Sequence, residues 1–381
     1  MAGSRGHLRQ VDLVRVVTFA AVIAVHTISQ TSDPGNVAAN ALLTPLHFTR
    51  SMFFFLTGFV LVYTYRGRPL APGKFLRRRL TLVGVPYLVW TVLYFGLQQV
   101  DAPPLAPPDA IKTLWDDIYR GIGWYQLYFL LVSMQFYVLF PLVMRLLHLA
   151  RRHHAAILGA SLAVQLAVTA TLTYAPAPAA DSWLGDLWAN QGTLVISYQF
   201  YLVAGCLAAY HFEAFQAWID EHRGLVVTTV LATLAFSEAW YFTEIDRGVP
   251  PWQATSVLGP EMVPWFAAVV LGLYLLGSWW SRRTPAGSAG DRLVAAASTR
   301  SFGVFLVHPA FIWFFNWVDD GWLPAHLWPF VATLAAYAFA VGGSLVFVEA
   351  VIRSPLSKVL IGRERLAPKA STVSIPIASQ T

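Results

Sequence analysis

Three ionisable residues lie in the first apolar stretch of the chain, namely Asp12, Arg15 and His26. Arg15 and His26 are eleven positions apart. This spacing is about three turns of an α-helix, so the two side chains share one face, roughly 16 Å apart along the axis. Asp12 precedes Arg15 by one turn on nearly the same face. Ionisable groups inside a membrane span are costly and indicate function by default, and an imidazole can accept a proton near neutral pH.

A purely structural interpretation of this stripe is also open. Asp12 and Arg15 can reach the cytoplasmic headgroups from the end of a span, and His26 can be a hydrogen-bonding residue between packed helices. For Asp12 alone we favour the structural interpretation. For Arg15 and His26 together we favour function, because charges within the membrane are seldom incidental.

Other ionisable residues occur in later apolar stretches. Arg50 opens the second stretch near the outer side, where it is either an interfacial anchor or a cation facing a pore, and His47 lies one turn before it. His308 lies in the ninth stretch, where a single histidine is either a packing residue or part of a site. Glu349, near the end of the tenth stretch, is expected to pair with Arg353 at the interface.

Long apolar stretches must position these side chains. Of the 381 residues, 56% are hydrophobic and 12% are charged, about half the charged share of a soluble protein. Lipid is therefore the expected solvent, and each stretch is close to the roughly 20 residues that a spanning helix needs. We predict an all-α fold, a polytopic transmembrane helical bundle of about ten spans. The predicted spans are 11–29, 46–65, 80–98, 126–145, 155–174, 193–211, 224–242, 262–280, 301–317 and 327–351.

The distribution of charge predicts the orientation of these spans. With the N-terminus in the cytoplasm, the inner segments hold 21 of the 26 lysines and arginines and the outer loops hold three. Positive charge accumulates on the cytoplasmic side, so both termini are expected there. The outer loops hold twelve acidic residues, and the acidic, Pro-rich loop 99–123 is long enough to cover the outer mouth. We expect a membrane domain over 1–366 and a disordered cytoplasmic tail over 367–381.

Several classes of site and partner are excluded by composition. The single cysteine, Cys206, allows neither an internal disulfide nor a cysteine-based metal cluster, and we expect no metal. The net charge of +6 comes from basic segments between apolar stretches. This pattern is typical of membrane topology rather than of a nucleic-acid-binding face. We therefore expect contact with membrane lipids and no nucleic-acid partner. The expected location is a membrane, and we take it to be a bacterial plasma membrane.

Five local patterns follow one another along the chain. They read VDLVRVVTFAAVIAVH from Val11, RSMFFFLTGF from Arg50, FLRRRLTLVGVPY from Phe75, WYQLYFLLVSMQFYVLFPL from Trp124 and SFGVFLVHP from Ser301. Together they resemble the integral-membrane acyltransferase-3 family, whose members acylate sugars and other hydroxyl or amine acceptors. The resemblance covers about residues 9–352, without the hydrolase-like domain that some members carry.

The resemblance implies roles for individual residues. The family's Arg-x10-His motif matches Arg15 and His26, which implies that His26 is catalytic and that Arg15 helps to hold the donor near the cytoplasmic mouth. The family's R-x-x-R motif is matched only in part. Arg78 and Arg79 stand at its first position, and Leu82 stands where the second arginine is expected.

The function implied is that of a membrane acyltransferase. It would move an acetyl or other short acyl group from cytoplasmic acyl-CoA, a donor substrate rather than a bound cofactor. The acceptor would be a hydroxyl or amine of a carbohydrate or lipid-linked glycan, with His26 as general base. Arg50, His308 and Asp12 are the further residues expected to bind substrates.

Two other classes of function remain open. A transporter or exporter of a glycan precursor or small molecule would also carry an ionisable stripe, although transporters often show internal repeats and the sequence shows none. A scaffold would have little use for so many buried ionisable groups. Release of CoA that depends on an acceptor distinguishes the enzyme from both.

Overall fold

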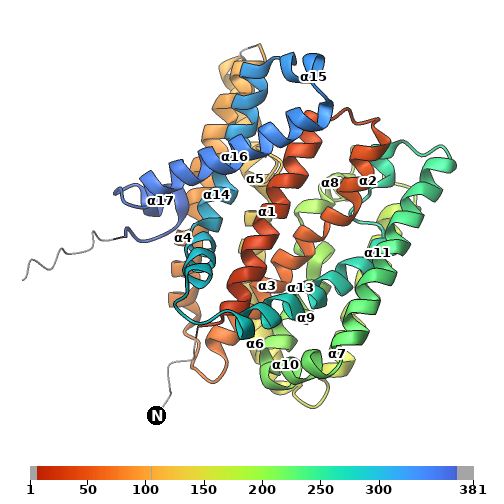
Figure 1. Cartoon of the computed structure of the whole chain (residues 1–381), viewed down its shortest axis with the longest axis vertical. Helices are drawn as coiled ribbons and strands as arrows, with labels where there is room; N and C mark the ends of the chain where they lie inside the picture. Colours follow the sequence, from red (N-terminus) through yellow and green to blue (C-terminus); the bar gives the residue numbers. More distant parts are fainter. Residues whose placement is uncertain (1–6, 104, 367–381) are drawn as a thin grey trace, which may run out of the picture.

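The computed structural model describes residues 7–103 and 105–366, which form a bundle of helices without a strand (Figure 1). Nine helical segments of this described part are long and apolar enough to cross a membrane. They are α1 (Arg9–Thr31), α2 with α3 (Val37–Leu46, Phe48–Tyr65), α4 (Pro72–Asp101), α6 (Tyr128–Leu149), α7 (His154–Tyr174), α11 (Arg223–Asp246), η3 with α13 (Pro260–Met262, Val263–Arg283), α14 (Ala289–Asp319) and α16 (Pro329–Val351).

The sixth predicted span, 193–211, differs from the others. It consists of the 3-10 turn η2 (Val195–Tyr198) and α9 (Gln199–Tyr210), after which α10 (Phe212–Glu221) turns away by 97°. The 12 residues of α9 rise about 18 Å, less than the roughly 30 Å of a bilayer core. With this bent pair counted as one span the total reaches ten. The predicted all-α polytopic bundle is confirmed, whereas the predicted tail over 367–381 lies outside the described residues.

Short helices occupy the connections between the spans. They are α5 (Pro107–Arg120), α8 (Trp183–Ala189), η1 (Gln191–Thr193), α12 (Pro251–Ala254) and α15 (Trp322–His326), and a further short helix, α17 (Ser357–Ile361), follows the last span. Two interactions hold α5, which lies within loop 99–123, against the rest of the protein. The Tyr87 hydroxyl donates a hydrogen bond to the Ile118 carbonyl at 2.5 Å, and Arg120 forms an ion pair with Asp186 at 2.9 Å. Burial raises the pKa of Asp117 in α5 to about 6, and the negative charge of the neighbouring Asp116 adds to this effect.

The two ends of the bundle differ in charge. Because consecutive long helices alternate in direction, the beginnings of α1, α4, α7 and α11 share one end with the last turns of α3, α6, α9 and α13. We call this end the basic face; it lies at the bottom of Figure 1, with α10, whereas α15 lies at the top, on the far face. Basic residues gather in the helix ends and connections on this side; among them are Arg66, Arg68, Lys74, Arg77, Arg78, Arg79, Arg145, Arg151, Arg152, Arg223, Arg282 and Arg283.

Helices α3 and α9 pack backbone against backbone at two glycines. A Cβ atom added at Gly205 would lie 2.0 Å from the Phe55 carbonyl oxygen, and one at Gly58 would lie 2.3 Å from the Leu202 carbonyl oxygen. Small residues allow such close approach between membrane helices, where packing replaces the hydrophobic effect. The contact fixes α3 in the bundle, and α3 carries Arg50.

Candidate functional site

The polar stripe of α1 is joined to α14 through Ser298. The Ser298 hydroxyl donates to Asp12 Oδ1 at 2.7 Å and accepts from Arg15 Nη1 at 3.3 Å. Asp12 is buried, and the His7 ring contacts its other carboxylate oxygen. A buried carboxylate needs such partners, so the arrangement fixes the position of the Arg15 guanidinium.

Arg15 lines a cavity of about 300 Å³ that lies toward the basic face. Two further cations line this basic-face cavity, Arg79 from α4 and Arg363, which follows α17, together with the hydroxyls of Thr57 and Ser133. Arg79 Nε is buried without a hydrogen-bond partner among the described residues. Three guanidinium groups with so few acidic partners can bind an anion such as a phosphate group.

Two of the residues predicted to bind the donor do not line this cavity. Arg78 is exposed on the outside of α4 and only its neighbour Arg79 faces inward. Asp12 does not line the cavity. It accepts a hydrogen bond from Ser298, which in turn contacts Arg15. Adjacent helical residues point about 100° apart, so only one residue of an Arg-Arg pair can face the same cavity.

Arg363 reaches the basic-face cavity because the chain turns sharply after α17. Gly362 has a φ of +61° and lies so close to α4 that an added Cβ would be 2.1 Å from the Leu82 carbonyl oxygen. Only glycine adopts this conformation freely and permits that approach. The Trp90 indole donates to the Leu360 carbonyl at 2.8 Å and holds the same segment on α4. Arg363 is thereby brought next to Leu82, the position at which the resemblance leads one to expect a second arginine.

His26 lines a small central cavity of about 30 Å³, in the middle of the bundle. Its ring packs on Tyr125 with 4.3 Å between ring centroids and stacks on His308 at 5.4 Å. The buried amide of Gln126 lines the same cavity. None of the described hydrogen bonds involves the His26 ring, so its nitrogens are available to a substrate.

The orientation of His308 follows from the proline after it. Pro309 has no N–H, so in α14 it leaves the carbonyl of Phe305 without its usual helical partner. His308 Nδ1 donates to this carbonyl at 2.8 Å. The other nitrogen, Nε2, is buried and has no partner in the described part of the chain. His308 is fully buried and supports the His26 ring rather than lining the central cavity.

Arg50 supplies a positive charge to the central cavity. Its guanidinium carbon lies 5.3 Å from the centre of the Tyr128 ring, and Tyr198 is its hydrogen-bonding neighbour. No ion pair joins Arg50 to an acid within residues 7–103 and 105–366. Arg50 thus lies beside His26 with only aromatic partners, and this geometry favours the pore-facing interpretation over an interfacial anchor.

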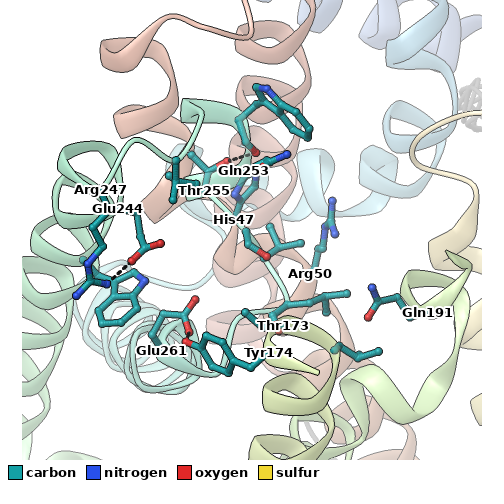
Figure 2. A pocket seen from close by; sticks show the side chains of 18 residues that line it. His47, Arg50, Thr173, Tyr174, Gln191, Glu244, Arg247, Gln253, Thr255 and Glu261 are labelled. Carbon is teal, nitrogen blue, oxygen red and sulfur yellow. Dashed lines mark hydrogen bonds and ion pairs between the residues drawn. The ribbon is translucent and has the colours of Figure 1, made fainter. Parts of the chain in front are cut away.

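A third and larger cavity, of about 790 Å³, opens on the far face. Figure 2 shows Glu244 with Arg247 and Glu261 with Tyr174 on one side of this far-face cavity, and Arg50 and Gln191 on the other. Arg247 donates to Glu244 at 2.6 Å, and the Tyr174 hydroxyl donates to Glu261 at 3.2 Å. Two indoles, Trp240 and Trp252, complete the lining. Such a mixture of polar and aromatic groups suits a polar organic ligand.

The three cavities share residues and form a row. Phe53 and Phe129 line both the basic-face and the central cavity, whereas His47 and Arg50 line both the central and the far-face cavity. The predicted residue His26 lies in the middle of this row. Three residues of these sites, Arg363, Tyr125 and Gln126, were not predicted from the sequence. Tyr125 and Gln126 belong to the WYQLYF pattern, whereas no pattern near Arg363 marks it as part of a site.

Glu349 pairs with Arg353, as the sequence predicts, and also with Arg300 at 2.5 Å. Arg300 belongs to α14 and Glu349 to α16. The pair therefore joins two spans at their basic ends and lies apart from the three cavities.

Comparison with known proteins identifies the family. A family model described as an acyltransferase domain matches residues 8–349, nearly the whole chain. No curated protein and no solved structure shows a significant match. The match includes every helix that lines the three cavities; only Arg363 and Gly362 lie beyond it. The chain therefore belongs to the acyltransferase-3 family and is a membrane acyltransferase.

Proposed function

We propose that this enzyme moves a short acyl group from acyl-CoA in the cytoplasm to a hydroxyl or amine of a carbohydrate or lipid-linked glycan that enters from the far face. The observation that carries the proposal is the row of three cavities with His26 at its centre. Two substrates can approach one imidazole from opposite sides in this arrangement.

The donor binds in the basic-face cavity. Arg15, Arg79 and Arg363 are suited to the phosphates of CoA, since guanidinium groups make bidentate, charge-assisted hydrogen bonds to phosphate oxygens. The excess of arginine and lysine on the basic face supports a cytoplasmic location for this face, where acyl-CoA is made. Asp12 and Ser298 are positioning residues that hold Arg15.

His26 acts as the general base. Its neutral imidazole takes the proton of the acceptor hydroxyl while the oxygen attacks the thioester carbonyl, and a C–O bond forms. The carbon–sulfur bond then breaks, the ester leaves with the acceptor, and the CoA thiolate takes the proton back from His26. Arg50 lies beside the same cavity and stabilises the negative charge on the carbonyl oxygen in the intermediate.

The acceptor binds in the far-face cavity. The indole faces of Trp240 and Trp252 can pack against the C–H faces of a sugar ring, and Glu244 and Glu261 can accept hydrogen bonds from its hydroxyls. His47 and Arg50 stand where this cavity meets the central one, so an acceptor hydroxyl that passes them comes within reach of His26.

Release of CoA tests the proposed reaction. Purified protein in lipid vesicles is expected to release free thiol from acetyl-CoA only when an acceptor glycan is added, because no step removes the acyl group without one. Mass spectrometry of cell-surface glycans, with and without the gene, identifies the acceptor through a mass difference of one acyl group. Movement of a glycan across the vesicle membrane without thiol release would instead indicate the transporter.

Replacing Arg363 with alanine is expected to weaken donor binding. Loss of one of three cations around the CoA phosphates should raise the KM for acetyl-CoA by about tenfold, since a charge-assisted hydrogen bond contributes about 1.5–3 kcal/mol, and should change kcat little. The matched control is Arg68→Ala, which removes an exposed arginine of the same face that lines none of the three cavities. Equal KM values for the two variants would contradict a role of Arg363 in donor binding.

A further inference from the structure

Four phenylalanine rings from four helices meet between the basic-face and the central cavity. They are Phe19 of α1, Phe53 of α3, Phe129 of α6 and Phe305 of α14. Phe53 is at the centre, with its ring centroid 4.6 Å from that of Phe19, 4.6 Å from that of Phe129 and 5.7 Å from that of Phe305. Phe305 also contacts Phe19 at 5.8 Å and Phe129 at 5.5 Å. We call these four residues the phenylalanine constriction.

The phenylalanine constriction lies on the path between the donor and His26. Phe19 lines the basic-face cavity, Phe305 lines the central cavity, and Phe53 and Phe129 line both. A thioester held by its CoA phosphates in the basic-face cavity must therefore pass its acyl end between these rings to reach the imidazole. Phe19, Phe53 and Phe305 are buried, so packed side chains enclose the passage.

The space beyond the rings is small. The central cavity holds about 30 Å³, and one water-sized group needs roughly 10–15 Å³ on this measure. Such a space admits a methyl and a carbonyl group and little more. Each further methylene would have to displace Phe53, Phe129 or Phe305, and packed interiors resist changes of even one methylene.

We propose that the phenylalanine constriction selects the acyl group by length and restricts the donor to acetyl-CoA. This inference rests on the proposed function, because it concerns the passage of that donor's acyl end. It assigns to four apolar side chains a role in specificity in addition to packing.

A matched control separates selection from packing. Phe54 follows Phe53 on α3, is fully buried, and contacts Phe129 at 4.9 Å between ring centroids. It lines neither the basic-face nor the central cavity. Phe53→Val and Phe54→Val therefore remove the same atoms from adjacent core positions, but only the first widens the passage.

The experiment compares thiol release from acetyl-, butyryl- and octanoyl-CoA. In Phe53→Val the ratio of kcat/KM for the longer donors to that for acetyl-CoA is expected to rise at least about tenfold, the effect of one methylene in a tight pocket. The ratio in Phe54→Val should stay within about twofold of the wild type. Phe129→Val and the milder Phe53→Leu provide independent tests if Phe53→Val folds poorly.

Two outcomes would overturn the inference. One is an unchanged ratio in Phe53→Leu and Phe129→Val while both still consume acetyl-CoA. The other is a wild-type enzyme that uses octanoyl-CoA as well as acetyl-CoA. In both cases thiol release shows that acyl transfer itself occurs, whereas failure of the proposed function would appear as no acceptor-dependent release from any donor.

Discussion

Replacing His26 with alanine is expected to abolish acyl transfer. A positioned general base contributes about 10²- to 10⁴-fold to the rate. Among the described residues, the other imidazole that lines the central cavity is that of His47, which lies where this cavity meets the far-face cavity, so it is not placed to replace His26 without loss. His308 cannot replace it, because it is fully buried and does not line this cavity. The loss should appear in kcat, while the KM for acetyl-CoA changes little, since Arg15, Arg79 and Arg363 remain.

The measurement is thiol release from acetyl-CoA by purified protein in vesicles, with thermal unfolding recorded in parallel. His326→Ala is the control, because it removes an exposed histidine whose ring bonds only to the Trp322 carbonyl on the far face. Turnover of His26→Ala at the wild-type rate, in protein of wild-type thermal stability, would show that another group accepts the proton.

Substituting alanine for Gly205 is expected to destabilise the protein strongly. The added Cβ would lie 2.0 Å from the Phe55 carbonyl oxygen and 3.0 Å from the Phe59 amide nitrogen, so α9 and α3 must move apart. Overpacking of this kind costs about 1–3 kcal/mol or more, and here the opposing atoms are backbone atoms that cannot change rotamer. Because α3 carries Arg50 and Phe53, activity should fall together with stability.

Gly159→Ala in α7 is the matched control. No heavy atom lies within 4 Å of the Cβ that would be added at Gly159, so the same substitution should be neutral or should stabilise the helix by up to about 1 kcal/mol. Thermal unfolding in detergent compares the two variants. Equal unfolding temperatures would mean that α3 and α9 can separate without cost.

The spans and the central histidine were largely predictable from the sequence. Apolar length predicts membrane helices reliably because the bilayer sets it, and helical spacing alone places Arg15 and His26 on one face. The break after Tyr210 was not predictable, since hydropathy reports the apolar content of a segment and carries no information on bends. The start of α14 at Ala289, twelve residues before the predicted 301, shows how far a helix can extend beyond its apolar part.

Contacts between distant helices could not be predicted from one sequence. Arg363 reaches the site only because Gly362 lets the end of α17 approach α4, and the sequence around it resembles any polar terminus. The phenylalanine constriction combines residues of four helices whose lateral arrangement no local pattern specifies. The sequence also does not show whether Arg78 or Arg79 faces inward. This depends on the packing of α4, which turns Arg79 toward the cavity.

The phenylalanine constriction also bears on the membrane potential. Aqueous cavities on either side of a thin apolar layer confine the voltage drop to that layer, where moving one elementary charge costs or yields about 2.3 kcal/mol per 100 mV. In the proposed mechanism the acyl end of the donor is neutral, and the CoA phosphates stay with the arginines of the basic-face cavity. In the proposed mechanism the proton handed from the acceptor through His26 to the thiolate is the sole charge that crosses. If the reaction proceeds in this way, the electric field across the membrane acts on that proton transfer and leaves the transit of the acyl group unaffected.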